Sequence, residues 1–240
     1  MATGTSELEA ALLGSGAPWG VAFAAVSPAM QSFARLLADA AQHPVPVLLI
    51  GEAGTGKSTF ARALHAVSSR AARPFVTVDC TTVVEDLSIP ARNAHRGTLF
   101  LHEVAELPLA VQATALKLLQ DSHPLRVRLV ASTRHDLDAE MAAGRFRKDL
   151  FYRLDVLELT VPPLRERRED VVPMARAFAA SIARREGRSP PELSPALERA
   201  LLRYSWPGNV NELRSTLQRL LILSPGSSLD VSALPDRIPG

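Results

Sequence analysis

The chain has 240 residues, of which 47% are hydrophobic and 22% charged, and this ordinary globular composition excludes intrinsic disorder and a fibrous repeat. A formal net charge of +2 is too small to indicate nucleic-acid binding by itself. Apolar runs such as residues 45–50 are far shorter than the roughly 18 residues that span a bilayer. The N-terminus has no signal-peptide pattern, and the single cysteine, Cys80, cannot form an internal disulfide. We therefore expect a cytoplasmic protein without a membrane partner.

The first expected helix follows a lead that is rich in glycine and alanine. Ser27 can cap this helix, and Pro28 suits its first turn. Its apolar face is expected to consist of Met30, Phe33, Leu36 and Leu37. Residues 45–50 form a short β-branched run bounded by proline and glycine, and residues 58–68 carry apolar side chains at helical spacing. The expected order is therefore strand, glycine-rich loop and helix.

Further strands are expected at residues 75–78, 98–101, 127–131 and 156–161, with helix-like stretches such as residues 108–119 between them. Strands that alternate with helices favour a mostly parallel sheet covered on both faces. The fold class expected from this pattern is therefore α/β.

The strand pattern stops after Pro162 and Pro163. Three helices are expected beyond this point, opening at Asp170, at Ser194 and at Asn209, with Glu212 completing a capping box for the third. The charged run of residues 165–170 is expected to form a solvated turn. We therefore expect an α/β core over residues 1–168 and a small all-helical domain over residues 169–240.

Residues 51–58 match the pattern G-x-x-x-x-G-K-[ST] between the first strand and its helix. Glycines let the backbone approach phosphate closely, Lys57 would reach the β and γ phosphates, and Ser58 would reach Mg²⁺. The loop reads phosphates rather than a base, so the motif by itself predicts a nucleotide. The expected cofactor-binding residues are Gly51, Glu52, Ala53, Gly54, Thr55, Gly56, Lys57, Ser58 and Thr59.

Six segments in the same order resemble the central AAA+ domain of the sigma-54-dependent transcriptional activators, the bacterial enhancer-binding proteins. They are GEAGTGK (51–57), GTLFLHE (97–103), ELP (106–108), GRFRKDLFYRL (144–154), PPLRER (162–167) and WPGNV (206–210). The resemblance implies a three-layer P-loop NTPase core with a helical lid. It also implies ATP with Mg²⁺ as cofactors, ring assembly, and hydrolysis between subunits that remodels RNA polymerase holding sigma-54.

The resemblance assigns catalytic roles to three residues. Glu103 corresponds to the base that activates water, while Arg147 and Arg153 correspond to arginines presented to the neighbouring subunit's nucleotide. An alternative interpretation makes both arginines ordinary surface charges. His102 replaces the family's aspartate that organises Mg²⁺, and imidazole is a poorer ligand for that hard cation. The histidine is either a change tolerated where catalysis is no longer demanded or a new metal ligand.

Three further positions differ from the family. Asp79 stands where an asparagine is usual, so it either faces Glu103 and raises one of the two carboxyl pKa values, or pairs with His102. Arg134 replaces the sensor I asparagine. Asn211 replaces the sensor II arginine, whose charge-assisted bond to phosphate a neutral amide cannot supply.

Two connections are shorter than the resemblance implies. Seventeen residues separate Asp79 from Gly97, and no G-A-F-T-G-A sequence, which the family uses to grip sigma-54, occurs in the chain. This connection lacks roughly twenty residues and the one between Gln120 and Arg128 roughly ten, although loop length itself costs little free energy. Both shortened segments belong to the family's pore-facing surface.

The leading functional hypothesis is an ATP-binding or ADP-binding AAA+ protein with poor or no hydrolysis that acts as a regulatory partner in transcription. The expected partners are a second copy, another AAA+ subunit of the sigma-54 activator type, or a protein of the sigma-54 pathway. No helix-turn-helix follows residue 235, so direct DNA binding is not expected. One alternative is an active AAA+ ATPase with a divergent protein substrate, and another is an interaction module that binds no nucleotide.

Overall fold

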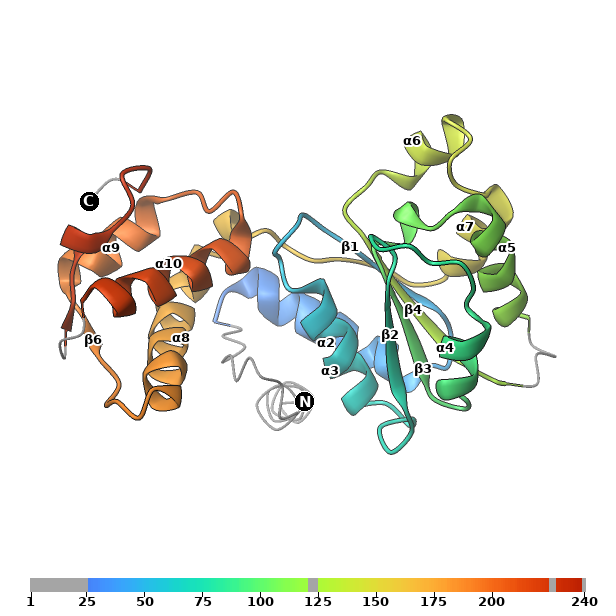
Figure 1. Cartoon of the computed structure of the whole chain (residues 1–240), viewed down its shortest axis with the longest axis horizontal. Coiled ribbons are helices and arrows are strands. Elements are labelled where there is room, and N and C mark those ends of the chain that lie inside the picture. The colour runs from blue at the N-terminus through green and yellow to red at the C-terminus, as the bar shows by residue number, and fades with distance from the viewer. Residues whose placement is uncertain (1–25, 121–124, 225–227, 239–240) are drawn as a thin grey trace. The chain divides into compact units, whose positions relative to one another are not determined.

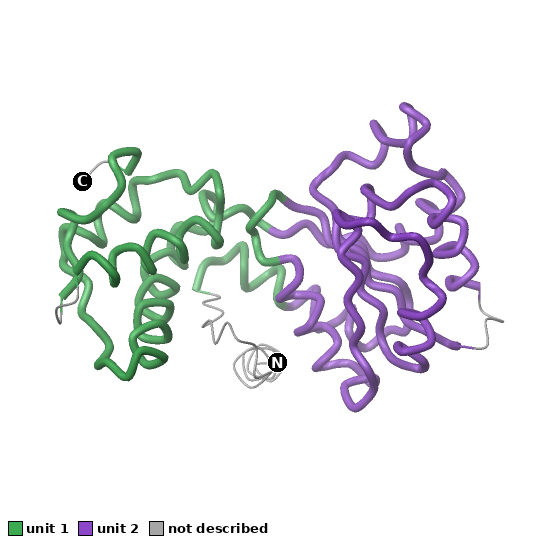
Figure 2. Tube along the Cα trace, viewed as in Figure 1, with its two compact units in different colours: residues 1–34, 52–56, 162–240 green, residues 35–51, 57–161 purple. Residues whose placement is uncertain are grey.

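The computed structural model describes residues 26–120, 125–224 and 228–238. These residues form two compact units (Figure 2). One unit consists of residues 35–51 and 57–161, and the other joins residues 162–238 to residues 26–34 and 52–56. The expected glycine-rich lead and part of the shortened 120–128 connection lie outside the described residues. The expected boundary at residue 168 stays a prediction, and the chain divides into these units at residue 161.

The first unit contains a five-stranded parallel sheet in the order β2-β3-β4-β1-β5. Its strands are β1 (Val47–Ile50), β2 (Phe75–Asp79), β3 (Thr98–His102), β4 (Arg128–Thr133) and β5 (Glu158–Thr160). Its helices are α3 (Lys57–Ala66), α4 (Ser88–Asn93), α5 (Leu109–Leu118), α6 (Leu137–Ala142) and α7 (Lys148–Leu154), and the 3-10 turn η1 spans Val104–Glu106. Helices lie on both sides of the sheet (Figure 1), which confirms the three-layer α/β fold class.

Alternation along β3 decides which side chains meet which helix layer. Leu99 and Leu101 join a buried cluster with residues of α4, α5 and α7. Successive strand side chains point to opposite faces, so Phe100 and His102 point to the face covered by α3. His102 therefore lies on the side of the sheet where α3 begins, directly after the glycine-rich loop.

The end of helix α2 (Pro28–Gln42) is held by a buried arginine of β4. The guanidinium of Arg128 donates to the carbonyl oxygens of Ala40 (2.8 Å), Ala41 (3.4 Å) and Val45 (3.2 Å). The last carbonyls of a helix have no partner within the helix, so a cation there satisfies them. Burial lowers the pKa of Arg128 to about 10, which still leaves it charged at neutral pH.

The second unit is mainly helical. It contains α8 (Val171–Arg185), α9 (Pro195–Arg203), α10 (Asn209–Leu223), a two-residue parallel pair of β6 (Glu192–Leu193) and β7 (Ser228–Leu229), and the 3-10 turns η2 (Leu164–Glu166), η3 (Arg168–Asp170) and η4 (Val231–Ala233). Ser194 caps α9 as predicted, because its Oγ accepts from the Leu197 N–H at 3.1 Å. Leu213, Leu217 and Leu220 of α10 are fully buried in this unit's core.

Two predictions about charged and apolar faces were wrong. Leu36 is 56% exposed and lies outside the apolar face of α2. The run of residues 165–170 is not a fully solvated turn, because Arg167 and Asp170 are buried. Asp170 accepts hydrogen bonds from the backbone N–H and the hydroxyl of Ser27, each at 2.8 Å. Ser27 nevertheless caps α2 as expected, since its Oγ accepts from the Met30 N–H.

The predicted capping box at Asn209 was also wrong. Glu212 does reach back to a backbone N–H, but the donor is Gly208, at 2.9 Å. Asn209 has a positive φ of 51° and its side chain turns away from α10. The side-chain amide of Asn209 therefore bonds to groups outside α10, which are described below. None of the helices in the described part of the chain is long and apolar enough to cross a membrane.

Candidate functional site

The glycine-rich loop follows β1 directly and ends where α3 begins. Gly54 and Gly56 have φ of 76° and 104°, a region that glycine adopts without strain. Lys57 opens α3, and its Nζ returns to donate to the carbonyl oxygen of Gly51 at 2.7 Å. The predicted residue types thus produce a tight backbone curl next to a helix N-terminus, the arrangement that binds phosphate elsewhere.

Residues 52–56 of this loop belong to the helical unit and are held by other residues of that unit. The carboxylate of Glu52 pairs with the guanidinium of Arg165 through two bonds of 2.7 and 2.8 Å. The amide of Asn209 donates to Glu52 at 3.1 Å and to the carbonyl oxygen of Ala53 at 3.0 Å. The bond from Arg165, followed by that from Asn209, lowers the pKa of Glu52. Asn209 also accepts the N–H of Leu164 at 2.8 Å, so it is fully engaged.

Two more backbone groups of the loop are fixed in the same way. The carbonyl oxygen of Gly54 accepts the Val210 N–H at 3.0 Å. The carbonyl oxygen of Thr55 accepts from the guanidinium of Arg167 at 2.8 Å. A Cβ at residue 54 would overlap the carbonyl oxygen of Gly208. The loop therefore requires glycine at residue 54 both for its backbone angle and for this close approach.

Glu103 follows β3 and faces the loop lysine. Its Oε1 lies 3.0 Å from Nζ of Lys57, and the two side chains are only 6% and 4% exposed. Its Oε2 accepts the backbone N–H of Arg134 at 2.9 Å. Glu103 has a left-handed φ of 56°, which turns its side chain back over the end of the sheet. The structure thus brings the expected base and the expected phosphate-binding lysine into one buried pair.

His102 makes contact with the hydroxyl that was predicted to reach Mg²⁺. Its Nδ1 lies 3.4 Å from Oγ of Ser58 and 3.1 Å from Oγ of Ser132. The pairing of Leu101 with Ala131 places residues 102 and 132 side by side on the next positions of β3 and β4. Register therefore explains the contact with Ser132, whereas Ser58 lies on α3, which covers this face of the sheet.

Asp79 does not take either role that the sequence suggested. It pairs across the sheet with His102 as a backbone neighbour, but its carboxylate accepts from the hydroxyl (2.7 Å) and backbone N–H (3.1 Å) of Thr81. These two bonds lower the pKa of Asp79, and His102 contributes less. The prediction that a carboxylate here raises a pKa by facing Glu103 is therefore wrong.

The side chains of the expected arginines and sensor residues do not contact the pair of Lys57 and Glu103. Arg147 forms an ion pair with Asp149 at 2.7 Å, and Arg153 is exposed on α7. The side chain of Arg134 lies 3.4 Å from Glu106, so only its backbone contacts Glu103. Asn211 is exposed on α10. Their proposed roles therefore rest on the resemblance.

Sequence reasoning missed three residues that hold the loop, Arg165, Arg167 and Asn209, and also Ser132, which contacts His102. The signal for Asn209 was the Trp-Pro-Gly turn directly before it. This turn changes the direction of the chain just before α10, so the side-chain amide of Asn209 lies outside the helix. Arg165 and Arg167 gave no separate signal within a charged run, because their partners Glu52 and Thr55 lie more than a hundred residues earlier in the chain.

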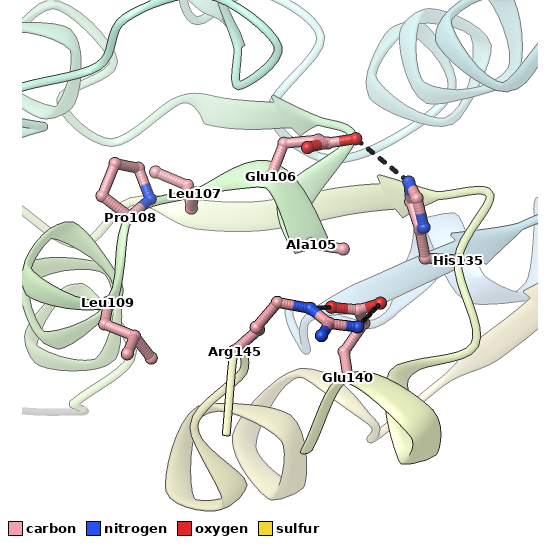
Figure 3. Close-up of a pocket in the computed structure, with 8 residues that line it drawn as sticks. All are labelled: Ala105, Glu106, Leu107, Pro108, Leu109, His135, Glu140 and Arg145. Carbon is pink, nitrogen blue, oxygen red and sulfur yellow. Dashed lines mark hydrogen bonds and ion pairs between the residues drawn. The ribbon is translucent and has the colours of Figure 1, made fainter. Parts of the chain in front are cut away.

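A cavity of about 500 Å³ lies beside this site in the α/β unit (Figure 3). It is lined by Ala105, Glu106, Leu107, Pro108, Leu109, His135, Glu140 and Arg145, and none of these is a loop residue. Its charged groups already pair with each other, Glu106 with His135 at 3.0 Å and Glu140 with Arg145 at 2.6 Å. The cavity therefore offers no uncompensated charge for phosphate.

The chain matches two known protein families. The Sigma-54 interaction domain family matches residues 24–164, and the AAA+ ATPase lid domain family matches residues 165–240. The transcriptional regulatory protein ZraR of Klebsiella oxytoca is 36% identical over 244 aligned positions, which cover 89% of this chain and 55% of ZraR. The regulator NorR of Salmonella paratyphi C is 42% identical, with 83% of this chain and 45% of NorR covered.

A solved structure shows the same fold across most of the chain. NtrX of Brucella abortus, solved in complex with ATP, superposes with a TM-score of 0.84 at 32% identity, covering 94% of this chain and 59% of NtrX. The chain spans about half the length of the curated relatives it matches. The two family matches together include every described residue, and the chain accordingly belongs to the Sigma-54 interaction domain family and includes its AAA+ lid domain.

Proposed function

We propose that this chain binds ATP or ADP, hydrolyses ATP poorly or not at all, and acts as a regulatory partner in sigma-54-dependent transcription. The observation that carries the proposal is the buried ion pair of Lys57 and Glu103. In this pair the expected phosphate-binding group and the expected water-activating group bind each other. The proposed setting is the cytoplasm, and the proposed partner is a second copy or another AAA+ subunit of the sigma-54 activator type. Direct contact with DNA is not part of the proposal.

Nucleotide binding is supported by the loop and by relatives. Gly54 and Gly56 have positive φ angles, which curl the loop, and the N-terminus of α3 that follows contributes the positive end of its helix dipole. NtrX of Brucella abortus was solved both with ATP and with ADP. Residues 51–59 are therefore the proposed nucleotide-binding residues of this chain, with Lys57 as the principal cation.

Poor hydrolysis is supported by the state of Glu103. A general base needs a free oxygen within reach of the attacking water. Here one oxygen of Glu103 is held by Lys57 and the other by the Arg134 N–H. Arg147 and Arg153 remain the proposed groups for a neighbour's nucleotide, and Arg147 would first have to leave Asp149. The only ligand that this chain was expected to offer Mg²⁺ is the hydroxyl of Ser58, which Nδ1 of His102 contacts at 3.4 Å.

A regulatory rather than a remodelling role is supported by sequence that ZraR has and this chain lacks. The alignment with ZraR spans 244 positions, yet 89% of the 240 residues of this chain, about 214 residues, take part in it. About 30 positions of ZraR therefore face no residue of this chain. The short β2–β3 connection holds only the six-residue helix α4. A coupling element with two arrangements is needed to transmit hydrolysis to a partner protein.

The deciding experiment measures ATP turnover and open-complex formation at a sigma-54 promoter, with this protein alone and mixed with an intact activator. The expected result is no open complex with this protein alone and a dose-dependent change in the activator's output. Lys57→Ala, which removes the phosphate-binding cation, serves as the matched control and should abolish the dose dependence. Open complexes formed by this protein alone would contradict the proposal. Robust turnover abolished by Glu103→Ala would establish the alternative, an active ATPase with a divergent protein substrate.

A further inference from the structure

The donor atoms around Ser58 do not suit a magnesium ion. Mg²⁺ in proteins takes hard oxygen ligands in strict octahedral geometry, usually including a carboxylate. The nearest acidic groups at the ends of β2 and β3 are Asp79 and Glu103. Asp79 is engaged by Thr81, and Glu103 is engaged by Lys57 and a backbone N–H. In the described part of the chain, no group of three or more His, Cys, Asp or Glu residues could hold a metal ion.

A ring nitrogen stands where an oxygen ligand is needed. Nδ1 of His102 lies 3.4 Å from Oγ of Ser58, the hydroxyl that the sequence motif assigns to the ion. The same nitrogen lies 3.1 Å from Oγ of Ser132, which is fully buried. The ring also packs against Phe100, with centroids 5.9 Å apart. His102 thus contacts Ser58, Ser132 and Phe100. A carboxylate at residue 102 would change the contacts of both serine hydroxyls.

We propose that nucleotide binding by this chain is independent of Mg²⁺, so that its ligand is the metal-free nucleoside diphosphate or triphosphate. This inference rests on the proposed function and concerns the same loop. The groups left to balance phosphate charge are Lys57, after it leaves Glu103, and the N–H groups at the start of α3. His102 closes the metal position by engaging the Ser58 hydroxyl itself.

The test compares the affinity of a fluorescent ATP analogue in Mg²⁺ and in EDTA, for the wild-type chain and two variants. For the wild type, the two dissociation constants should differ by less than about threefold. His102→Asp restores an oxygen ligand beside Ser58, and its affinity should fall by about tenfold or more when Mg²⁺ is removed. His102→Asn removes the ring without adding a charge and should stay as insensitive to Mg²⁺ as the wild type.

Two further arms make every outcome decisive. The double variant His102→Asp with Ser58→Ala should lose the restored Mg²⁺ dependence, because the hydroxyl ligand is gone. Thermal unfolding of each variant shows whether a loss of binding is only a loss of fold; the Mg²⁺-to-EDTA ratio in the wild-type chain, which needs no variant, stands either way.

A wild-type affinity that falls tenfold in EDTA would overturn the inference and leave the proposed function intact. A wild-type affinity that rises tenfold with Mn²⁺ or Co²⁺, but not with Mg²⁺, would also overturn it, since nitrogen ligands suit those ions and His102 would then be a metal ligand. Absence of binding under all conditions would instead contradict the proposed function, and the inference with it.

Discussion

The ammonium group of Lys57 lies 3.0 Å from Oε1 of Glu103, and both side chains are almost completely buried. A buried charge is costly unless it is paired, so removing either residue would leave the other without this ion-pair partner. Phosphate and Glu103 are both anions that Lys57 can pair with, and one lysine cannot pair fully with both. We therefore expect the proposed nucleotide and Glu103 to compete for the ammonium group of Lys57.

This competition predicts opposite effects of two substitutions on affinity. Lys57→Ala should weaken nucleotide binding by at least about tenfold, roughly 1.4 kcal/mol, because a charge-assisted bond to phosphate is lost. Glu103→Gln should instead tighten it several-fold, because Lys57 no longer has to leave a carboxylate. Titration with a fluorescent ATP analogue measures both. Weaker binding by Glu103→Gln in a folded protein would show that the pair does not compete with nucleotide.

Restoring the acidic residue before Glu103 should increase catalysis. Wild-type turnover is expected to be slow or undetectable, and His102→Asp should raise it, because an oxygen ligand improves Mg²⁺ placement without altering Glu103. Steady-state phosphate release in excess Mg²⁺ measures the change. Adding Glu103→Ala to His102→Asp should remove the gain. An unchanged rate in His102→Asp would mean that the ligand at residue 102 does not limit hydrolysis.

The bracing of the loop by Asn209 predicts a joint loss of stability and affinity. Asn209→Ala leaves the Leu164 N–H and the Ala53 carbonyl without their partner, at a cost of about 1–3 kcal/mol for buried groups. Residues 52–56 then lose part of their support, so nucleotide affinity should fall as well. Urea unfolding and nucleotide titration give the two readings. Gln218→Ala, an exposed amide on the same helix, is the matched control and should change neither.

Stability of the α/β unit should fall as the solution becomes acidic because of His65. This buried ring lies 2.9 Å from Oγ1 of Thr98, and burial lowers its pKa, with smaller contributions from Arg128, Arg62 and Arg70. Above the unfolded value near 6.5 the ring is neutral in both states, so its contribution is complete. As pH falls through the lowered pKa of the folded state, protonation favours unfolding.

The measurement is the melting temperature between about pH 5 and 7.5, compared for the wild type and His65→Gln, a range that spans the titration of histidine. The wild type should lose more stability toward acid than the variant, because glutamine keeps a hydrogen-bonding side chain but does not titrate there. Parallel curves for the two proteins would remove His65 as the cause. Carboxylates such as Asp79, whose pKa is lowered, act at lower pH in both proteins.

The sequence predicted the strands and the loop because they depend on local patterns. Residues 47–50 are apolar, with β-branched residues at both ends and a glycine after them, and the loop-to-helix turn that follows is encoded within a few residues. The partners of the loop were not predictable in this way. Arg167 and Asn209 meet it from positions more than a hundred residues later, and nothing local separates a buried arginine from a solvated one.

The prediction for the carboxylate of Asp79 was wrong for a related reason. A carboxylate near the catalytic glutamate on the sheet was expected to interact with it, but Thr81, two residues away, supplies two donors at no cost in chain entropy. The short-range bond decides the orientation of the side chain. His102 was predicted to matter, and its contact with Ser132 follows from strand register, which single-sequence reasoning does not provide.

The strand order places β1, the earliest strand of the sheet in the sequence, between β4 and β5. During synthesis on the ribosome, the run Val47–Ile50 therefore emerges long before either of its neighbours exists. It cannot pair until Arg128–Thr133 has been made, and the same strand supplies the arginine that closes the end of α2. The nascent chain must carry an unpaired apolar strand through that interval, a state open to aggregation and to chaperone binding. Fragments that end before β4 should for this reason be insoluble, whereas the full sheet should form in one late, cooperative step.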